Sequence, residues 1–486
     1  MIIMMNTNFI KKTKIIATIW PATRDSDMIL KLYKAWINVL RFNFSHADYE
    51  NAAKVALIVK QFNKENKTKL GLMLDTKWPE IRTGDYNGTK TYTKWDIFNI
   101  YVDKSKVSWD TQDQFCDYPF LLEDIEVWGI IKIESGLFDV VVKEKKSDYV
   151  VVEALHTIEI KQRRHINLPW IRLKLPWLME QDKKDVLFAI EQWFDYIAMS
   201  FVRNKENILE CREFLEQHNA HNIHIISKIE NQEAIDNYEE IIEYSDGVMV
   251  ARGDLWIEVP IENLPIYQQQ IIETCRKKWK YVIVATHLLE SMIENPFPTR
   301  AEVSDIFNAI SQKTDAIMLS GETTIGKFPI EAVEMMKSIA LKAESLLDYK
   351  YEEFENTHFT ETDNEKKCLI RGAISIAEKL GIDSIVVFTK TGRLAKIAAA
   401  YKSKIRIYAF TNQETTVTNT TLLFGVKSRY IPYSHHTQAL EEALQTMVAM
   451  NDIEDYGKTI VITDIKKDNY ETPTLEIVHV KQFLGL

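Results

Sequence analysis

A chain of 486 residues is long enough for roughly two to four domains. Its 46% hydrophobic and 27% charged residues are typical of a globular protein in water, and no stretch has the apolar length of a membrane span. The formal charge of −10 argues against a nucleic-acid-binding protein, which would carry a basic face.

The N-terminus and the cysteines predict a cytoplasmic protein. Residues 1–10 lack the long apolar run and the cleavage site of a secretory signal. No two cysteines form a CxxC pair, so we expect a reduced compartment in which all four are buried as small apolar side chains. They are Cys116, Cys211, Cys275 and Cys368.

Eight short β-branched runs recur along the chain, each ending in polar residues, with helical patterns between most of them. The runs are Lys14–Ile19, Asn38–Phe44, Leu70–Asp75, Tyr196–Phe201, Ile223–Ile229, Gly247–Ala251, Tyr281–Thr286 and Ala316–Ser320. The helical patterns include Asp48–Asn63, Gln181–Gln192, Asn204–His218 and Leu264–Lys278. Eight strands alternating with helices predict a parallel (β/α)8 TIM barrel, whose active site forms at the carboxyl ends of the strands.

The alternation is interrupted once, between the third and the fourth strand. After Gly84, about ninety residues read as strands and turns, including Ile97–Val102, Ile130–Ile133, Phe138–Lys143 and Tyr149–Leu155. Beyond an acidic linker, further strands are expected at Ser384–Phe388, Arg406–Phe410 and Lys458–Ile462, with a helix at Glu365–Leu380. We therefore predict a barrel (1–84 and 173–346), an inserted small β-barrel domain that acts as a lid (85–172), and a C-terminal α/β domain (347–486).

Three charged residues at the ends of consecutive strands indicate a metal-assisted site. Glu230 and Asp254 place two carboxylates where a hard cation such as Mg²⁺ can bind. Lys228 lies two residues before Glu230 on the same face of its strand, and an ammonium beside a bound cation suits phosphoryl transfer. Each carboxylate taken singly is about as easily interpreted as half of an ion pair on a solvated rim. Matching groups at the ends of three consecutive strands, with Thr286 on the third, favour the site.

Two further segments carry candidate ligands. In Arg252-Gly253-Asp254, the glycine lets backbone amides approach an anion closely. In the segment 41–46, Arg41, Asn43 and Ser45 share one face. The side-chain oxygens of Asn43 and Ser45, with those of Asp75 and Thr76, could bind a monovalent cation. The competing interpretation is that Asn43 and Ser45 only cap the next helix.

At this point the chain resembles the pyruvate kinase family. The segments that carry the resemblance include 13–19, 41–46, 74–84, 167–169, 226–232, 248–255, 285–293, 298–302 and 318–323. They cover the predicted barrel, and the C-terminal part matches more loosely. The resemblance implies transfer of the phosphoryl group of phosphoenolpyruvate to ADP, which gives pyruvate and ATP in glycolysis, and a homotetramer.

The resemblance also implies roles for individual residues. The expected substrate-binding residues are Arg41, Lys228, Gly253, Asp254 and Thr286. Of these, Lys228 would stabilise the phosphoryl group, and Thr286 would help to deliver the proton to enolpyruvate. Glu230 and Asp254 would bind Mg²⁺ (or Mn²⁺). The expected K⁺ ligands are Asn43, Ser45, Asp75 and Thr76, and the expected nucleotide contacts are His46, Arg82 and Arg164.

Some positions depart from the family pattern or refine it. Glu80 is typical of the K⁺-dependent branch. His287 replaces a glutamine that usually follows the catalytic threonine. The segment 389–393 resembles a phosphate-gripping loop for an effector, but Leu394 replaces a hydroxyl residue and the later glycine-rich effector loop is missing. The sequence therefore leaves undecided which phosphorylated effector binds, or whether any does.

All eleven tryptophans stand where the context indicates glycine. They are Trp20, Trp36, Trp78, Trp95, Trp109, Trp128, Trp170, Trp177, Trp193, Trp256 and Trp279. The 15 glycines are about 3% of the chain, where roughly 7% is usual. Eleven real replacements, at about 1–5 kcal/mol each, would exceed a typical stability of about 5–15 kcal/mol. We hypothesise that the gene uses UGA for glycine, and we call the chain with glycine at all eleven positions the glycine form.

Two other functions compete with a pyruvate kinase. If the tryptophans are real, a non-catalytic pyruvate-kinase-like binding protein is the alternative, although a decayed site would normally lose carboxylates or lysine as well. A Mg²⁺-dependent barrel that stabilises a pyruvate enolate, such as an aldolase, is weaker because the inserted domain suits closure over a nucleotide.

Overall fold

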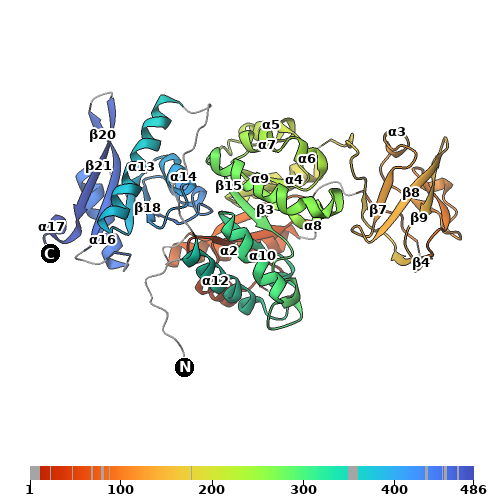
Figure 1. The fold of residues 1–486 in the computed structure, drawn as a ribbon, viewed down its shortest axis with the longest axis horizontal. Helices are drawn as coiled ribbons and strands as arrows, with labels where there is room; N and C mark the ends of the chain where they lie inside the picture. Colours follow the sequence, from red (N-terminus) through yellow and green to blue (C-terminus); the bar gives the residue numbers. More distant parts are fainter. Residues whose placement is uncertain are drawn as a thin grey trace.

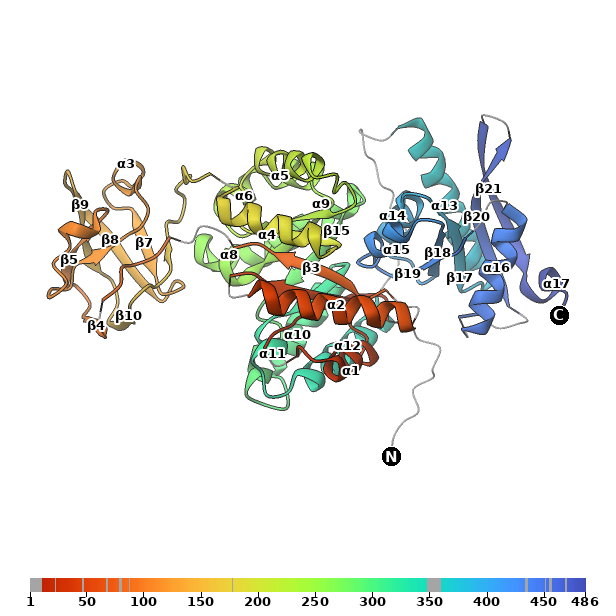
Figure 2. The same cartoon turned by 180° about the vertical axis from the view of Figure 1, so that it is seen from behind.

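The computed structural model describes residues 11–21, 23–45, 48–66, 69–77, 81–86, 88–176, 178–347, 360–432, 436–450, 452–453, 457–467 and 470–486. Three units lie in a row, with a barrel between an all-β insert and a C-terminal α/β unit (Figure 1). The view from behind shows the same order (Figure 2). The domain limits given above remain a prediction.

The central unit is a closed parallel barrel of eight strands, as predicted. They are β1 (Lys14–Thr18), β2 (Val39–Asn43), β3 (Gly71–Asp75), β12 (Tyr196–Met199), β13 (His224–Ile229), β14 (Gly247–Ala251), β15 (Tyr281–Ala285) and β16 (Ala316–Leu319). Each predicted run ends within two residues of the observed strand.

Helices surround this barrel. They are α1 (Ser26–Lys34), α2 (Tyr49–Asn66), α4 (Glu180–Glu191), α5 (Lys205–Gln217), α6 (Gln232–Asp236), α7 (Tyr238–Tyr244), α8 (Arg252–Glu258), α9 (Leu264–Lys277), α10 (Arg300–Ser311), α11 (Gly321–Thr324) and α12 (Pro329–Leu346). In the part of the chain that the structure describes, no helix is long and apolar enough to cross a membrane.

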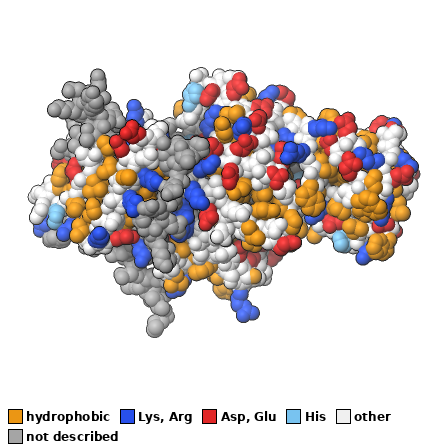
Figure 3. Space-filling view, turned by 45° about the horizontal axis from the view of Figure 1, so that its top comes forward, with side chains coloured by type: hydrophobic (Ala, Val, Ile, Leu, Met, Phe, Trp, Pro, Cys, Tyr) orange, Lys and Arg blue, Asp and Glu red, His pale blue; other side chains and the backbone are white. Residues whose placement is uncertain are grey.

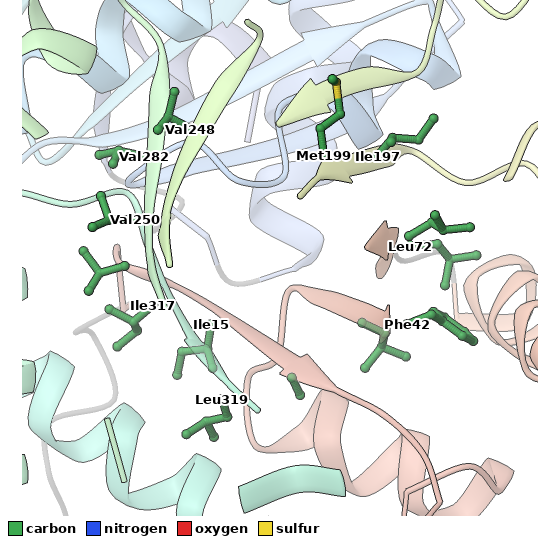
Figure 4. Packing of buried hydrophobic residues seen from close by; sticks show 14 of the residues in the cluster. Ile15, Phe42, Leu72, Ile197, Met199, Val248, Val250, Val282, Ile317 and Leu319 are labelled. Carbon is green, nitrogen blue, oxygen red and sulfur yellow. The ribbon is translucent and has the colours of Figure 1, made fainter. Parts of the chain in front are cut away.

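The alternation of side chains along each strand separates two apolar layers and positions the site. Outward residues such as Ile15, Phe42 and Leu72 pack in one cluster with the helices (Figure 4). The residues between them belong to a second cluster, which includes Ile16, Val39, Met73 and Ile226. Two residues further along the same strands stand Thr18, Arg41, Asp75 and Lys228. Because side chains repeat every second residue, these polar groups lie on the inner face at the carboxyl end of the barrel.

The insert is an all-β unit with one apolar core. Its strands are β4 (Thr89–Tyr92), β5 (Ile97–Tyr101), β6 (Gln114–Phe115), β7 (Ile130–Ile133), β8 (Phe138–Lys145), β9 (Tyr149–Ala154), β10 (Ile158–Lys161) and β11 (Ile166–Asn167), with the short helix α3 (Leu121–Asp124). They pair as a six-stranded and a two-stranded sheet. Both sheets contribute to the same core, for example through Tyr92, Phe98 and Ile160.

The C-terminal unit is a five-stranded sheet with helices. It contains α13 (Glu361–Leu380), β17 (Ser384–Phe388), α14 (Arg393–Ala400), β18 (Arg406–Thr411), α15 (Glu414–Asn419), β19 (Val426–Tyr430), α16 (His436–Ala449), β20 (Lys458–Lys467), β21 (Tyr470–His479) and α17 (Val480–Leu484).

One prediction about the cysteines was wrong. Cys116, Cys211 and Cys275 are buried, but Cys368 is exposed. The buried stripe of α13 runs through Ile370, Ala373, Ile374 and Ala377, and position 368 lies off that stripe.

Charged side chains of both signs are interspersed over the face shown in the space-filling view, rather than gathered into one basic field (Figure 3). A protein that handles phosphates must therefore place its cations locally.

His224, at the start of β13, is expected to make the fold sensitive to acid. Burial lowers the pKa of His224 to about 3; Asp246 opposes this shift, and Lys396, Arg212 and Lys280 add to it. Its Nδ1 lies 3.2 Å from the hydroxyl of Tyr281. Below about pH 6.5 the unfolded chain binds a proton at this residue that the folded chain does not. The free energy of unfolding should therefore fall as the pH drops from about 6.5 towards 3.

Urea unfolding of wild type and His224→Gln at pH 7 and pH 5 measures this effect. We expect the wild type to lose more stability than the variant between the two pH values. His218→Gln, at an exposed histidine, is the control. Equal losses in wild type and His224→Gln would contradict the prediction.

Candidate active site

Lys228 stands at the centre of a buried charge cluster at the mouth of the barrel. Its Nζ lies 3.0 Å from Asp75 Oδ1 and 2.9 Å from Glu230 Oε1, and it donates to Ser200 Oγ at 2.8 Å. Arg41 lies on β2, which pairs with β3, the strand that carries Asp75. Its Nε donates to Asp75 Oδ2 at 2.7 Å. The cluster therefore holds two cations and two carboxylates.

The electrostatics of the cluster follow from burial and these partners. Burial alone would raise the pKa of Asp75, but the charges of Arg41 and Lys228 hold it below its ordinary value. Burial opposes the charge on Lys228 too, yet Asp75 and Glu230 raise the pKa of its ammonium. Lys228 is therefore a fixed positive charge in a site that is buried from water, where charge acts more strongly on a bound anion than it does in solvent.

Glu230 has an oxygen available for a cation. Its Oε2 accepts a hydrogen bond from the Phe201 N–H at 2.7 Å. Among the described residues no hydrogen bond reaches its buried Oε1, which lies 2.9 Å from the Lys228 ammonium. Burial raises the pKa of Glu230 to about 7; Lys228 opposes this shift, and Asp254 and Asp75 add to it. A bound cation would stabilise the ionised form of Glu230 and so oppose this rise in its pKa.

The donor set therefore fits a divalent ion that keeps other ligands. No group of three acidic, histidine or cysteine side chains with metal-binding geometry occurs among the described residues. Glu230 and Asp254 supply two carboxylates, which suits Mg²⁺ because this ion usually keeps waters and substrate oxygens in its remaining positions.

Thr286 is held between backbone groups of two elements. Its Oγ1 accepts the Gly253 N–H at 2.6 Å and donates to the Ala285 carbonyl at 2.6 Å. A side chain at position 253 would press on Thr286, since a Cβ there would lie 3.2 Å from Oγ1. In this structure the Gly253 amide is thus bonded to Thr286, the residue expected beside it in the site.

Asn43 and Asp75 are paired across β2 and β3, which brings the expected K⁺ ligands to one edge. Asn43 Oδ1 accepts the Ser45 N–H at 3.2 Å, and Thr76 Oγ1 accepts the Ser200 N–H at 3.2 Å. A carboxylate has about four acceptor positions, and Asp75 uses three of them for Arg41, Lys228 and Ser200. The oxygens that remain fit a monovalent cation.

A cavity of about 270 Å³ opens at this edge, lined by Arg41 and Asn43 among others. Trp20, one of the eleven tryptophans, also lines it. The side chain at position 20 therefore forms part of the wall of the cavity beside the charge cluster.

The chain matches two family models along most of its length. Residues 10–333 match the pyruvate kinase barrel domain, and residues 368–478 match the pyruvate kinase alpha/beta domain. This chain belongs to the pyruvate kinase family.

Individual relatives agree with this assignment. The chain is 38% identical to the pyruvate kinase of Clostridium perfringens over 455 residues, which is 93% of this chain and 96% of that protein. It is 42% identical to the pyruvate kinase of Staphylococcus haemolyticus over 423 residues, 85% of this chain and 71% of that protein. A crystal structure of a pyruvate kinase from Cryptosporidium parvum superposes with a TM-score of 0.90 at 31% identity, covering 97% and 96% of the two chains.

The arginines expected to contact the nucleotide lie where the insert joins the barrel. The Thr83 N–H donates to the Arg164 carbonyl at 2.8 Å, so the two connecting segments run side by side. Arg82 donates from its guanidinium to the Arg163 carbonyl at 2.8 Å, and Arg164 pairs with Glu134 at 3.0 Å. Both arginines thus stand apart from the contacts of the Lys228 cluster.

Other expected residues lie outside the described part of the chain. These are His46, Glu80, Trp78 and Trp177. Their contribution to the site stays a prediction.

Two residues of the site were missed by sequence reasoning. Ser200 follows β12 directly and bonds to Asp75, to Lys228 and to the Thr76 carbonyl. The signal was present, since Ser200 is the polar residue next to the end of the fourth predicted strand, Tyr196–Phe201. Arg252 stood in the tripeptide 252–254, but the sequence assigned it no role of its own.

Arg252 joins α8 to the segment that carries Thr286. It pairs with Asp305 of α10 at 2.7 Å and donates to the Thr286 carbonyl at 2.8 Å. The guanidinium is buried, so its planar fork fixes the backbone of residue 286, whose φ is 68°.

Arg252→Gln should lower kcat by about ten- to a hundredfold, because small displacements of a reacting group have effects of this size. Steady-state kinetics of the glycine form with and without the change would measure it. Arg212→Gln is the matched control, since Arg212 pairs with Asp246 at 2.7 Å away from the site. An unchanged kcat in a folded Arg252→Gln variant would contradict the positioning role.

Proposed function

We propose that this chain transfers the phosphoryl group of phosphoenolpyruvate to ADP, giving pyruvate and ATP, and that it requires Mg²⁺ (or Mn²⁺) and K⁺. The observation that carries the proposal is the Lys228 cluster, a buried ammonium within 3.0 Å of two strand-end carboxylates. Membership of the pyruvate kinase family supports the substrates. No observation favours a non-catalytic binding protein or an aldolase.

Substrate phosphate is proposed to bind between Arg41 and Lys228. Both side chains reach Asp75, so a single carboxylate orients the two cations. Charge on the transferring phosphoryl group is spread over its oxygens, and preorganised cations stabilise it without reorganisation. Lys228 also compensates the negative charge that stays on the enolate oxygen.

Glu230 and Asp254 are the proposed ligands of the divalent ion. When bound, such an ion neutralises charge on phosphoryl and substrate oxygens. Substrate carboxylate would bind at the start of α8, where the amides of Gly253 and Asp254 begin a helix. Binding there requires the carboxylate to share or replace the Thr286 contact of the Gly253 N–H.

Thr286 is proposed to help deliver the proton that converts enolpyruvate to pyruvate. Its hydroxyl is already held by one donor and one acceptor, so the position of its oxygen is fixed. A hydroxyl in this arrangement can pass a proton on without carrying a net charge.

The remaining assignments rest on the family. We propose K⁺ binding by Asn43, Ser45, Asp75 and Thr76, and nucleotide contacts from His46, Arg82 and Arg164. We also propose a cytoplasmic homotetramer that acts in glycolysis.

Pyruvate release from phosphoenolpyruvate and ADP tests the proposal. It should be measured for the glycine form with Mg²⁺, with and without K⁺, and with Glu230→Gln as the inactive control. Activity that needs ADP, Mg²⁺ and K⁺ would support the function. A folded glycine form without activity would overturn it.

A further inference from the structure

Most tryptophans of this chain adopt a backbone conformation that favours glycine. Seven of them have positive φ, namely Trp20 (99°), Trp36 (80°), Trp95 (80°), Trp128 (73°), Trp170 (64°), Trp193 (58°) and Trp279 (56°). Only Trp109 and Trp256, among the tryptophans in the described ranges, do not. The other aromatic residues are an internal control, because in the same ranges no tyrosine and only Phe201 have positive φ. Aromatic character therefore does not explain the pattern.

Three of the seven end helices in the same way. At the end of α1, the Trp36 N–H donates to the Tyr33 carbonyl and the Ile37 N–H to the Leu32 carbonyl. Trp193 after α4 and Trp279 after α9 repeat both bonds at the same spacing. This pair of bonds is the Schellman motif, and its left-handed residue is usually glycine.

The chain itself uses glycine at a corresponding position. After α13, Gly381 has a φ of 65°, and the following Ile382 N–H donates to the Ala377 carbonyl. The spacing equals that of Ile37 and Leu32. Trp36, Trp193 and Trp279 thus occupy the position that Gly381 fills after α13, and that Asn219 and Lys313 fill after α5 and α10.

Three more occupy the third position of a β-turn. The closing bonds run from the Asp96 N–H to Thr93, from the Gly129 N–H to Glu126 and from the Ile171 N–H to Leu168. Trp95, Trp128 and Trp170 precede these donors with positive φ, which at the third position is typical of glycine in a type II turn. Pro169 stands at the second position of the last turn, as in a Pro-Gly turn.

Four of the seven indoles gain little burial in exchange, whereas Trp279 is only 7% exposed. Trp95, Trp128, Trp170 and Trp193 are 61%, 68%, 61% and 74% exposed. Lysines lie over three of these rings, such as Lys60 at 5.8 Å from Trp193. Exposed cation–π pairs are weak and need no positive φ. A selected role for these aromatic rings is therefore not supported by their surroundings.

Trp256 has ordinary φ but lies at the junction of the site and the insert. It belongs to α8, the helix that begins with Arg252 and Asp254. Its ring tip would lie 3.5 Å from a Cβ at Gly136, in the turn between β7 and β8. An indole here fills space between the site helix and the insert that glycine would leave open.

We infer that the protein made by its own cell carries glycine at the tryptophan positions, because its gene uses UGA as a glycine codon. Left-handed backbone is unfavourable for a residue with a Cβ, and glycine does not have this cost. One reassigned codon explains all seven positive φ values, six of them in two kinds of structural motif and the seventh at Trp20. The inference does not depend on the proposed activity.

Two direct measurements test the inference. The gene should contain UGA at all eleven positions, and peptide mass spectrometry of protein from the source cells should find glycine there. The tryptic peptide 185–203 covers position 193 in one fragment. UGG codons, or a peptide mass that includes tryptophan, would overturn the inference. The native protein should also show tyrosine fluorescence without a tryptophan band.

A crossed set of variants tests the physical reason without using activity. In the chain that carries tryptophan at all eleven positions, Trp193→Gly should raise the apparent Tm by about 2–4 °C. Trp193→Ala should raise it by less, because alanine keeps the Cβ. Tyr244, at the end of α7 and 44% exposed, is the matched aromatic residue without positive φ. There the order should reverse, with Tyr244→Gly below Tyr244→Ala. The same order at both positions would contradict the argument.

Discussion

Replacing Lys228 with methionine is expected to lower kcat of the glycine form by about a thousandfold, the upper range for loss of one preorganised charge-stabilising donor. The buried ammonium lies within 3.0 Å of Asp75 and 2.9 Å of Glu230, so no water can take its place without disturbing both carboxylates. Because its charge matters most in the transition state, KM for phosphoenolpyruvate should change far less than kcat. Steady-state kinetics with saturating ADP and Mg²⁺ would show this.

The control is Lys205→Met, at a lysine that pairs with Glu240 at 3.4 Å on the surface. It should leave kcat unchanged. Thermal unfolding of both variants separates loss of chemistry from loss of fold. If Lys228→Met stays folded and keeps kcat within tenfold of its parent, the proposed role of Lys228 is wrong.

Asp315→Ala is expected to destabilise the protein by about 3–5 kcal/mol, because it leaves a buried charge without its partner. Asp315 precedes β16 and forms an ion pair with Lys402, which follows α14 in the C-terminal unit. Both side chains are almost fully buried. Asp315 also accepts the Phe424 N–H at 3.0 Å and the Val282 N–H at 3.2 Å. One carboxylate therefore ties the barrel to the C-terminal sheet.

Urea unfolding of Asp315→Ala and of the double variant Asp315→Asn/Lys402→Met would measure this effect. The double variant should recover most of the lost stability, since removing both charges of a buried pair is often nearly neutral. Glu50→Ala is the surface control, because Glu50 pairs with Lys54 at 2.6 Å where both side chains are exposed. An equally small loss for Asp315→Ala and Glu50→Ala would contradict the prediction.

Strand periodicity was sufficient to locate the barrel and most of the site. The alternation that places Val39 and Arg41 on one face can be read from the chain, as can that of Met73 and Asp75. In a parallel barrel the carboxyl ends of all strands meet, so the sequence predicts that the residues ending the strands gather there. The glycine-like context of the tryptophans was also visible, since Pro169-Trp170 and Trp20-Pro21 are turn sequences.

Only the closed barrel shows which of the site residues are in contact with one another. Lys228 meets Asp75 from 153 positions away, and Arg252 reaches Thr286 through a loop that no local pattern specifies. Ser200 became part of the site because β12 pairs with β3 and places it over Asp75 and Thr76. The exposure of Cys368 likewise depends on which face of α13 the sheet covers. Sequence fixes the direction of each side chain along its own element, because backbone geometry repeats locally. Distances between elements follow from the tertiary hydrogen bonds and packing that bring those elements together. The positive φ at six of the tryptophans belongs to local helix ends and turns, which the structure shows directly.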